Sequence, residues 1–105
     1  MELIPIEAIP NQKFNVQLSG KTYNISINTR RGLSFLSMSI GETPLVSGRI
    51  CLPNKKIEIP NYKFQGVLFW HCQDNETPFY KQFGVLHKLY YATDEEWSEA
   101  VNATA

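Results

Sequence analysis

The segment from Phe14 to Ile27 reads FNVQLSGKTYNISI, and it decides the fold. Apolar residues take alternate positions on both sides of Gly20, which is typical of half-buried β-strands. A type II′ turn would have Gly20 and Lys21 as its central residues. A turn centred on Ser19 and Gly20 would shift the pairing by two residues and leave the same side chains on the same face. The sequence therefore predicts a β-hairpin whose apolar face is fixed and whose register is less firmly set.

The same period of two continues downstream of this hairpin, from residue 36 to residue 91. Short extended segments are expected, separated by turns rich in Gly, Pro, Asn and Asp. The expected strands are 36–40, 45–52, 57–60, 67–70 and 85–91, and the expected turns are 30–32, 41–44, 53–56 and 74–78. Pro60 keeps 57–60 at a sheet edge, because proline cannot donate to a ladder. Residues 1–92 are thus expected to form one all-β domain, a small antiparallel β-sandwich or open barrel.

The pattern changes at Thr93, and residues 93–105 form a distinct tail. Thr93 followed three residues later by Glu96 fits a capping box, which predicts a short C-terminal helix starting near Asp94. Trp97 and Val101 would share one face of that helix. We expect Trp97 to anchor the tail, either on its own sheet or on a neighbouring protein.

Charge and hydropathy bound the class of protein. Ten basic residues balance ten acidic ones over 105 residues, so the formal net charge is zero. Direct nucleic-acid binding is not expected, because it normally needs a basic excess. No apolar run approaches the roughly 18 residues of a membrane span, and the first residues lack the basic region of a signal peptide. We expect neither membrane insertion nor export by a signal peptide.

The only candidate for metal or nucleophile chemistry is His71-Cys72 with Asp74. Neighbours on a strand point to opposite faces, so His71 and Cys72 are not expected to share a metal. His87, the other histidine, has no second ligand beside it in the sequence. We therefore expect no catalytic, cofactor-binding or metal-binding residues. Cys51 and Cys72 are interpreted as buried reduced thiols, with a disulfide as the alternative.

Aromatic residues are concentrated in the second half of the chain: Phe64, Phe69, Trp70, Phe79, Tyr80, Phe83, Tyr90 and Tyr91. Core packing accounts for several of them. The number is large for one small core, so some are expected to face a partner, most readily a protein, then a sugar, then nucleic acid. The residues predicted to contact a partner are Trp70, Phe79, Tyr80, Phe83 and Trp97.

The order of short motifs along the chain is informative as a whole. The motifs are Ile4-Pro5, Ile9-Pro10-Asn11-Gln12, Phe14-x-Val16-x-Leu18-x-Gly20, Tyr23-x-Ile25-x-Ile27, Pro44-Leu45-Val46-x-Gly48, Gly66-x-Leu68-Phe69, Pro78-x-Tyr80, Phe83-Gly84 and Leu89-Tyr90-Tyr91. The series resembles the small plug proteins of contractile-tail phage baseplates, known from cyanophages. Two departures are His71-Cys72-Gln73, where the family tends to carry an aspartate directly after the strand, and the tail from Thr93, which has no counterpart.

The resemblance implies a structural protein of the virion at the distal end of the tail, made in the host bacterial cytoplasm. Such proteins sit near the central hub and the start of the tail tube and pack against hub, tube-initiating and wedge subunits. They are present in multiple copies and rearrange when the tail fires, and no enzymatic activity or cofactor comes with the family. Two readings compete with it: a carbohydrate-binding β-sandwich module and a small barrel enzyme.

Overall fold

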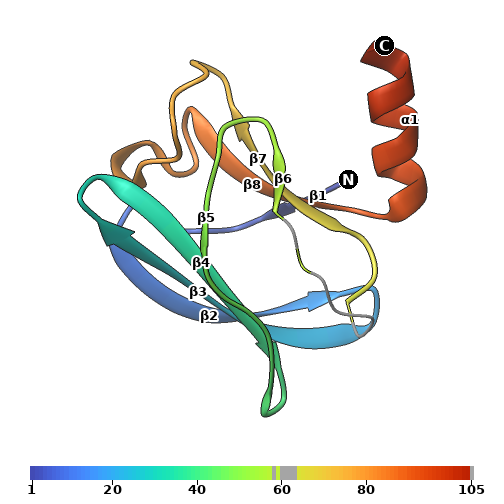
Figure 1. The fold of residues 1–105 in the computed structure, drawn as a ribbon, viewed down its shortest axis with the longest axis horizontal. Helices are drawn as coiled ribbons and strands as arrows, with labels where there is room; N and C mark the ends of the chain where they lie inside the picture. Colours follow the sequence, from blue (N-terminus) through green and yellow to red (C-terminus); the bar gives the residue numbers. More distant parts are fainter. Residues whose placement is uncertain (58, 60–63, 105) are drawn as a thin grey trace.

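The computed structural model describes residues 1–57, 59 and 64–104, with side chains up to residue 99. Two four-stranded antiparallel sheets face each other, and a helix projects beyond them at one end (Figure 1). The elements are β1 (Glu2–Ile4), β2 (Asn11–Leu18), β3 (Lys21–Arg30), β4 (Leu33–Ile40), β5 (Thr43–Ile50), β6 (Lys56–Ile57), β7 (Val67–Cys72), a 3₁₀ turn (Tyr80–Gln82), β8 (His87–Ala92) and α1 (Asp94–Thr104). The described strands form two separate sheets, which fits the β-sandwich among the two predicted architectures.

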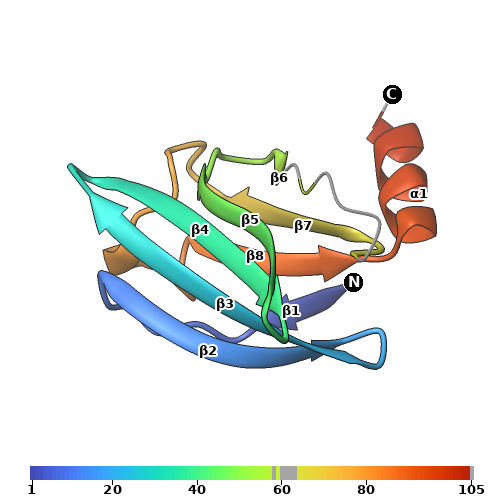
Figure 2. The same ribbon diagram turned by 60° about the horizontal axis from the view of Figure 1, so that its bottom comes forward.

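The first sheet, here called the meander sheet, has the strand order β2-β3-β4-β5 (Figure 2). Its first hairpin has the predicted face, with Tyr23 and Ile25 buried. Of the two registers that the sequence left open, the second is observed: Leu18 pairs with Lys21, so the turn is centred on Ser19 and Gly20. Both turn residues have positive φ, 50° and 81°, which defines type I′ and not type II′.

The other edge of the meander sheet is irregular. The β4–β5 register shifts on both sides of Met38, so β5 carries extra residues there. Gly48, at φ 60°, donates its N–H to Ser37 Oγ across 2.9 Å at one of these bulges. The strand starts at Thr43 and contains Pro44, which the sequence assigned to the turn; only residues 41–42 turn the chain. Proline is tolerated at this position because β5 is an edge strand.

The second sheet, here called the terminal sheet, has the order β1-β8-β7-β6 and so joins the first strand to the last. β1 was not predicted. β6 confirms an edge strand near residue 57, whereas Glu58 and Pro60 lie outside the described residues. β8 begins at His87 and not at Val85, because Gly84 to Leu86 form a turn in which Val85 and Leu86 donate to the carbonyl of Gln82.

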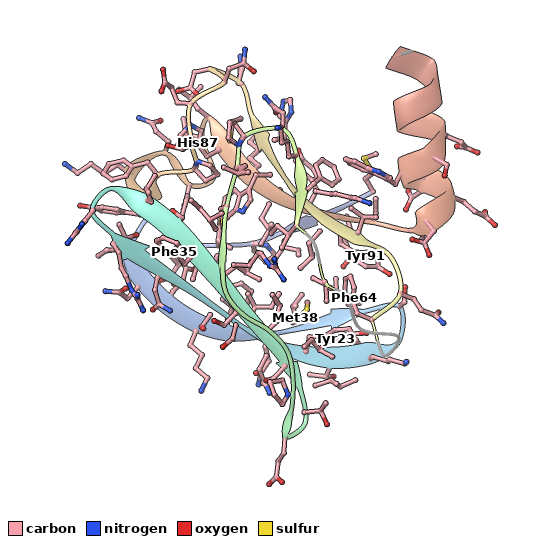
Figure 3. All side chains as sticks on the ribbon, viewed as in Figure 1. Tyr23, Phe35, Met38, Phe64, His87 and Tyr91 are labelled. Carbon is pink, nitrogen blue, oxygen red and sulfur yellow. The ribbon has the colours of Figure 1, made fainter. Side chains whose placement is uncertain are left out.

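The core lies between the sheets. The central strands of both sheets supply most of its completely buried apolar side chains, among them Ile25, Ile27, Leu36, Leu68, Trp70 and Leu89. Phe64, after β6, makes edge-to-face contacts with Tyr23 of the meander sheet and Tyr91 of the terminal sheet, at centroid distances of 5.5 and 6.0 Å. Figure 3 shows these three rings together between the sheets. The core therefore joins the two sheets along their central strands.

The capping box at the start of α1 is confirmed. Glu96 N–H donates to Thr93 Oγ1 at 3.1 Å, and Thr93 N–H donates to Glu96 Oε1 at 3.0 Å. These two bonds satisfy backbone donors that a helix start leaves free. The acidic residues of the first turn, Asp94 to Glu96, also complement the positive end of the helix dipole. The side chain of Val101 lies outside the described residues.

Candidate interaction surface

The outer face of the terminal sheet is apolar at its centre. Because side chains alternate along a strand, the residues that flank the buried ones point away from the core. In β7 these are Phe69 and His71, in β8 they are Lys88 and Tyr90, and in β1 the outward residue is Leu3. An outer sheet face exposed to water is normally polar, so this face differs from the usual alternation.

The three apolar ones, Leu3, Tyr90 and Phe69, form a continuous row across the sheet, which Trp97 of α1 extends. These four residues are here called the outer aromatic row. Leu3 is directly opposite Tyr90, and Tyr90 is directly opposite Phe69. The Tyr90 and Phe69 rings are stacked at 5.6 Å and 15°, and Trp97 of α1 lies 5.1 Å from the Phe69 ring. The row therefore links four elements, from the first strand of the chain to its C-terminal helix.

An open groove of about 310 Å³ runs beside the row and is lined by Met1, Phe69, His71 and Tyr90. Met1 and Leu3 are 54% and 52% exposed, and both Phe69 and Tyr90 are only half-buried. Apolar surface that is contiguous and rimmed by polar groups marks interaction sites in soluble proteins. This groove is the candidate functional site.

An ion pair lies at the edge of the outer aromatic row. The ammonium group of Met1 pairs with Glu96 Oε2, while Oε1 of the same carboxylate accepts from the Thr93 backbone. The ammonium group, and next the Thr93 N–H, lower the pKa of the Glu96 carboxyl. The start of α1 and the start of β1 are thereby fixed to each other beside the aromatic row.

Two of the residues predicted to contact a partner belong to the core instead. Trp70 is 0% exposed and Phe83 is 3% exposed, and their rings are stacked at 5.0 Å. This placement corrects the expectation for both, because buried side chains present no surface to a partner. Trp70 is buried because it alternates inward in β7, next to outward-pointing Phe69.

Phe79 and Tyr80 lie in the β7–β8 connection, half-buried and 4.7 Å apart, at the opposite end of the sandwich from α1 (Figure 1). Val85, 62% exposed, belongs to the same connection. Of the five predicted contact residues, the structure thus places only Trp97 in the outer aromatic row. Phe79 and Tyr80 form a separate, smaller exposed group.

Sequence reasoning did not select Leu3, Phe69 and Tyr90 as partner-binding residues, although it noted the last two as aromatic. The signal that would have found them is the alternation within β7 and β8. Once Leu68 and Leu89 are assigned inward, Phe69 and Tyr90 must face outward. Leu3 had no such signal, since β1 is only three residues long.

His87 lacks a ligand neighbour in the sequence, but the fold brings Asp74 to it. Asp74 Oδ1 lies 2.9 Å from His87 Nε2, and the Phe79 N–H donates to His87 Nδ1 at 2.9 Å (Figure 3 labels His87). Because Nδ1 accepts, the ring proton must sit on Nε2 and point at Asp74. Both ring nitrogens are therefore used to hold the connection between β7 and β8, and neither is left for substrate.

The carboxyl of Asp74 is stabilised in its charged form. The Glu76 N–H donates to Oδ1 at 3.1 Å, and this bond, followed by the one from His87, lowers the pKa of Asp74. Within the described parts of the chain, no three His, Cys, Asp or Glu side chains gather closely enough to hold a metal ion. His71 is exposed while Cys72 is buried, so the two lie on opposite faces as predicted.

Cys51 and Cys72 are both buried free thiols, as interpreted from the sequence. Burial raises the pKa of Cys51 to about 12 and that of Cys72 to about 11. The indole N–H of Trp70 makes no hydrogen bond of ordinary geometry to the described residues, although its proximity to the Cys51 thiol partly offsets the rise in that pKa. The thiolate form that nucleophilic chemistry requires is thus strongly disfavoured at both sites.

Comparison with known proteins adds one finding. Residues 1–95 match the protein-family model described as the cyanophage baseplate Pam3 plug gp18. The match spans every strand described above and stops in the first turn of α1. No curated protein matches the chain. Neither of the described helical segments is long and apolar enough to cross a membrane.

Proposed function

The chain belongs to the cyanophage baseplate plug family, and from this premise we propose that it joins neighbouring baseplate proteins through its outer aromatic row. Membership makes it a structural subunit of the phage tail that associates with other baseplate components. The proposal adds the surface by which it does so. The observation that carries it is the continuous run of Leu3, Tyr90 and Phe69 across three strands of one sheet face.

The partner surface that fits this row is apolar at its centre and polar at its margin. Aromatic side chains dominate the buried centres of protein interfaces, and charged groups lie at the rim. Tyr90 offers a hydroxyl that a partner acceptor would satisfy, and Lys88 and His71 supply the polar margin. Burial of each ring would contribute roughly 1 to 3 kcal/mol to association.

We place this subunit near the central hub and the start of the tail tube, in multiple copies, with hub, tube-initiating and wedge proteins as its neighbours. The resemblance of its motifs to the plug proteins supports this position, as it does synthesis in the host cytoplasm. An interface of half-exposed rings, with no covalent link, can also separate when the tail fires.

The protein acts without catalysis in this proposal. The imidazole of His87 is hydrogen-bonded at both nitrogens, and the two thiols have high pKa values. These facts argue against His87 as a general base and against either thiol as a nucleophile, and His71 lies on the opposite sheet face from Cys72.

The test is incorporation into baseplates assembled from co-expressed components. A Leu3→Ser, Tyr90→Ser double variant removes apolar surface from the row and leaves the Phe69–Trp97 contact in place. Phe35→Ser is the matched control, because Phe35 is a half-buried aromatic residue on the outer face of the meander sheet, beneath Arg30 at 5.8 Å. We expect the double variant to melt near the wild-type temperature and fail to incorporate, and the control to incorporate. Normal incorporation of the double variant would refute the proposed surface.

A carbohydrate-binding module is the second candidate, and the stacked Phe69–Tyr90 pair in an open groove favours it. Such a module would bind its ligand as an isolated protein. Titration with cell-wall oligosaccharides, followed by tryptophan fluorescence, separates the two functions. Saturable binding that Tyr90→Ser abolishes would establish sugar recognition, whereas no binding together with failed incorporation supports the baseplate contact.

A further inference from the structure

The edges of the two sheets differ in how well they are protected against pairing with another strand. Among the described strands at sheet edges, β6 has two residues and β1 has three, while β5 is interrupted by bulges and contains Pro44. Short strands, bulges and proline all prevent edge-to-edge pairing. β2 has eight residues in continuous register with β3, and none of them is a proline or part of a bulge. Figure 2 shows β2 at the lower margin of the molecule, with no described strand beyond it.

The backbone groups on the free side of β2 follow from the turn. Leu18 and Lys21 close a two-residue turn and form a hydrogen-bonded pair, so even-numbered residues of β2 bond to β3. Lys13, Asn15 and Gln17 therefore direct their N–H and C=O groups away from β3. Their backbones form no other hydrogen bond to the described residues, and all three are exposed.

The free stretch has defined limits. At its start, the Gln12 side chain is bonded twice to the Glu7 backbone, at 3.1 and 2.7 Å, so the incoming chain occupies that end. At its other end, Ser19 begins the turn. The stretch available for pairing thus runs from Lys13 to Gln17, with Asn15 at its midpoint.

The inner face of the meander sheet is incompletely covered at this edge. Phe14 and Val16 are only half-buried, whereas Ile25 and Tyr23, directly opposite them on β3, are buried. A further strand beyond β2 would cover the remaining exposed surface of these two apolar side chains. Hydrogen-bonding groups and uncovered apolar side chains together characterise recognition by strand addition.

We propose that a second copy of this chain pairs antiparallel with β2, with the two-fold axis at Asn15. In that register Lys13 lies opposite Gln17 of the second copy, and Phe14 lies opposite Val16 of the second copy. Aromatic and β-branched residues are favourable cross-strand partners, and no like charges meet. The pairing forms about six main-chain hydrogen bonds and joins two meander sheets into one continuous sheet.

The sequence of β2 favours a second copy as the occupant, because the seam is complementary to itself. The single charged residue of the strand, Lys13, meets a neutral amide, and each Phe14 meets a Val16. Moving the axis to residue 13 would set the two Lys13 side chains against each other, which excludes that register. The chain as a whole also carries no net charge to oppose self-association. The outer aromatic row lies on the other sheet, so this inference does not depend on the proposed function.

Charge substitutions at position 17 test the register, because each dimer would contain two contacts between positions 13 and 17. Sedimentation velocity over a concentration series is expected to show a monomer–dimer equilibrium for the wild type. Gln17→Lys should weaken the dimer roughly tenfold, and Gln17→Glu should strengthen it. The double variant Lys13→Glu, Gln17→Lys should recover the affinity that Gln17→Lys loses. Equal effects of both position-17 variants, or a wild type that stays monomeric at every concentration, would overturn the proposal.

Cross-linking tests the axis without relying on affinity. In Asn15→Cys the two introduced thiols would face each other about 5.5 Å apart between Cα atoms, which suits a disulfide. Asn28→Cys is the control, since Asn28 lies on the same sheet face but in the interior strand β3. Mild oxidation should give covalent dimers of the first variant and not the second. Dimers from both, or from neither, contradict the two-fold axis at Asn15. Neither result bears on incorporation through the outer aromatic row.

Discussion

Position 66 accepts only glycine without a change in the surrounding structure. It has φ +109°, and a Cβ built there would lie 2.5 Å from the Tyr91 hydroxyl oxygen. The Tyr91 hydroxyl donates to Gln65 O at 2.7 Å and accepts from Ser19 Oγ at 2.8 Å. The ring therefore connects the first hairpin turn to the segment entering β7, and any side chain at position 66 would displace it.

We expect Gly66→Ala to reduce the free energy of unfolding by about 2 to 4 kcal/mol, from backbone strain and the clash with Tyr91. Gly20→Ala is the matched control, because Gly20 also has positive φ but nothing lies within 4 Å of its added Cβ. Urea denaturation of both variants measures the difference. An equal loss in the two would show that Tyr91 does not depend on the empty space at Gly66.

The pKa of Asp74, lowered below its ordinary value of 3.8, predicts a dependence on pH. A group with a lower pKa in the folded state stabilises the fold above its unfolded pKa, and loses that contribution as the pH falls through the folded value. The melting temperature should therefore decrease as the pH is lowered below about 4. Asp74→Asn should make this decrease smaller. Glu76→Gln is the control. It makes the same charge change two residues away, at a carboxylate that forms no hydrogen bond to the described residues. A decline unchanged in Asp74→Asn would show that this carboxylate is not responsible.

At the scale of residues, the sequence predicts which side chains face inward but not which ones meet. The alternation places Tyr91 and His87 on the inner side of β8. Their hydrogen bonds to Ser19 and Asp74 join residues 72 and 13 positions apart. Such contacts depend on the path of irregular connections, for which the sequence carries no periodic signal.

At the scale of elements, α1 is the clearest success of sequence reasoning. The capping box is a local pattern, and the helix begins where the pattern places it. Its docking was left between two surfaces, and the structure has Trp97 on its own sheet, against Phe69. β1 was missed because a three-residue strand followed by Pro5 shows too few alternations to be recognised.

Removing the Trp97 contact tests whether it holds the helix. We expect Trp97→Ala to lower stability by about 1 kcal/mol, the usual value of one aromatic pair, and to speed hydrogen exchange in α1. Ser98→Ala, on the exposed side of the same turn, is the control. Unchanged exchange in Trp97→Ala would mean that the capping box and the Met1–Glu96 pair are enough to hold the helix.

The first hairpin shows why register is harder to predict than face. Both turns considered keep the apolar side chains inward, so hydrophobic pattern cannot choose between them. The observed type I′ turn matches the twist of the paired strands and places Ser19 within reach of Tyr91. Because Tyr91 belongs to the other sheet, its contact with Ser19 cannot be predicted from the sequence of the hairpin alone.

At the scale of the whole molecule, burial is greatest at the central strands and declines toward the edges. Ile25 on β3 is fully buried, while Val16 on the edge strand β2 is half-buried. An Ile25→Asp substitution should therefore cost about 4 kcal/mol or more, because it places a charge without a partner in the core. Val16→Asp, which the alternation alone would rank equally, should cost clearly less. Chemical denaturation of both measures the ranking, and a larger loss at Val16 would contradict this gradient.

The sandwich as a whole was predictable, because two sheets are the usual way to bury strands with one apolar face. The candidate site was only partly predictable. It combines β1, β7, β8 and α1, and the pairing of the first strand with the last brings Leu3 beside Tyr90. That pairing closes a separation of almost the whole chain, which no local pattern specifies.

The reactivity of the two buried thiols can report how often the core of the protein is transiently exposed. With pKa values of about 12 and 11, Cys51 and Cys72 are ionised at pH 8 in only about one molecule in a thousand or fewer while the sandwich is closed. An alkylating reagent should therefore label them only during excursions that expose the core, and the labelling rate should follow the population of open molecules. A comparison of the labelling rates of free subunits and of assembled tails would show how much the baseplate stabilises this domain against opening. The same rate, measured after tail contraction, would show whether that stabilisation is lost.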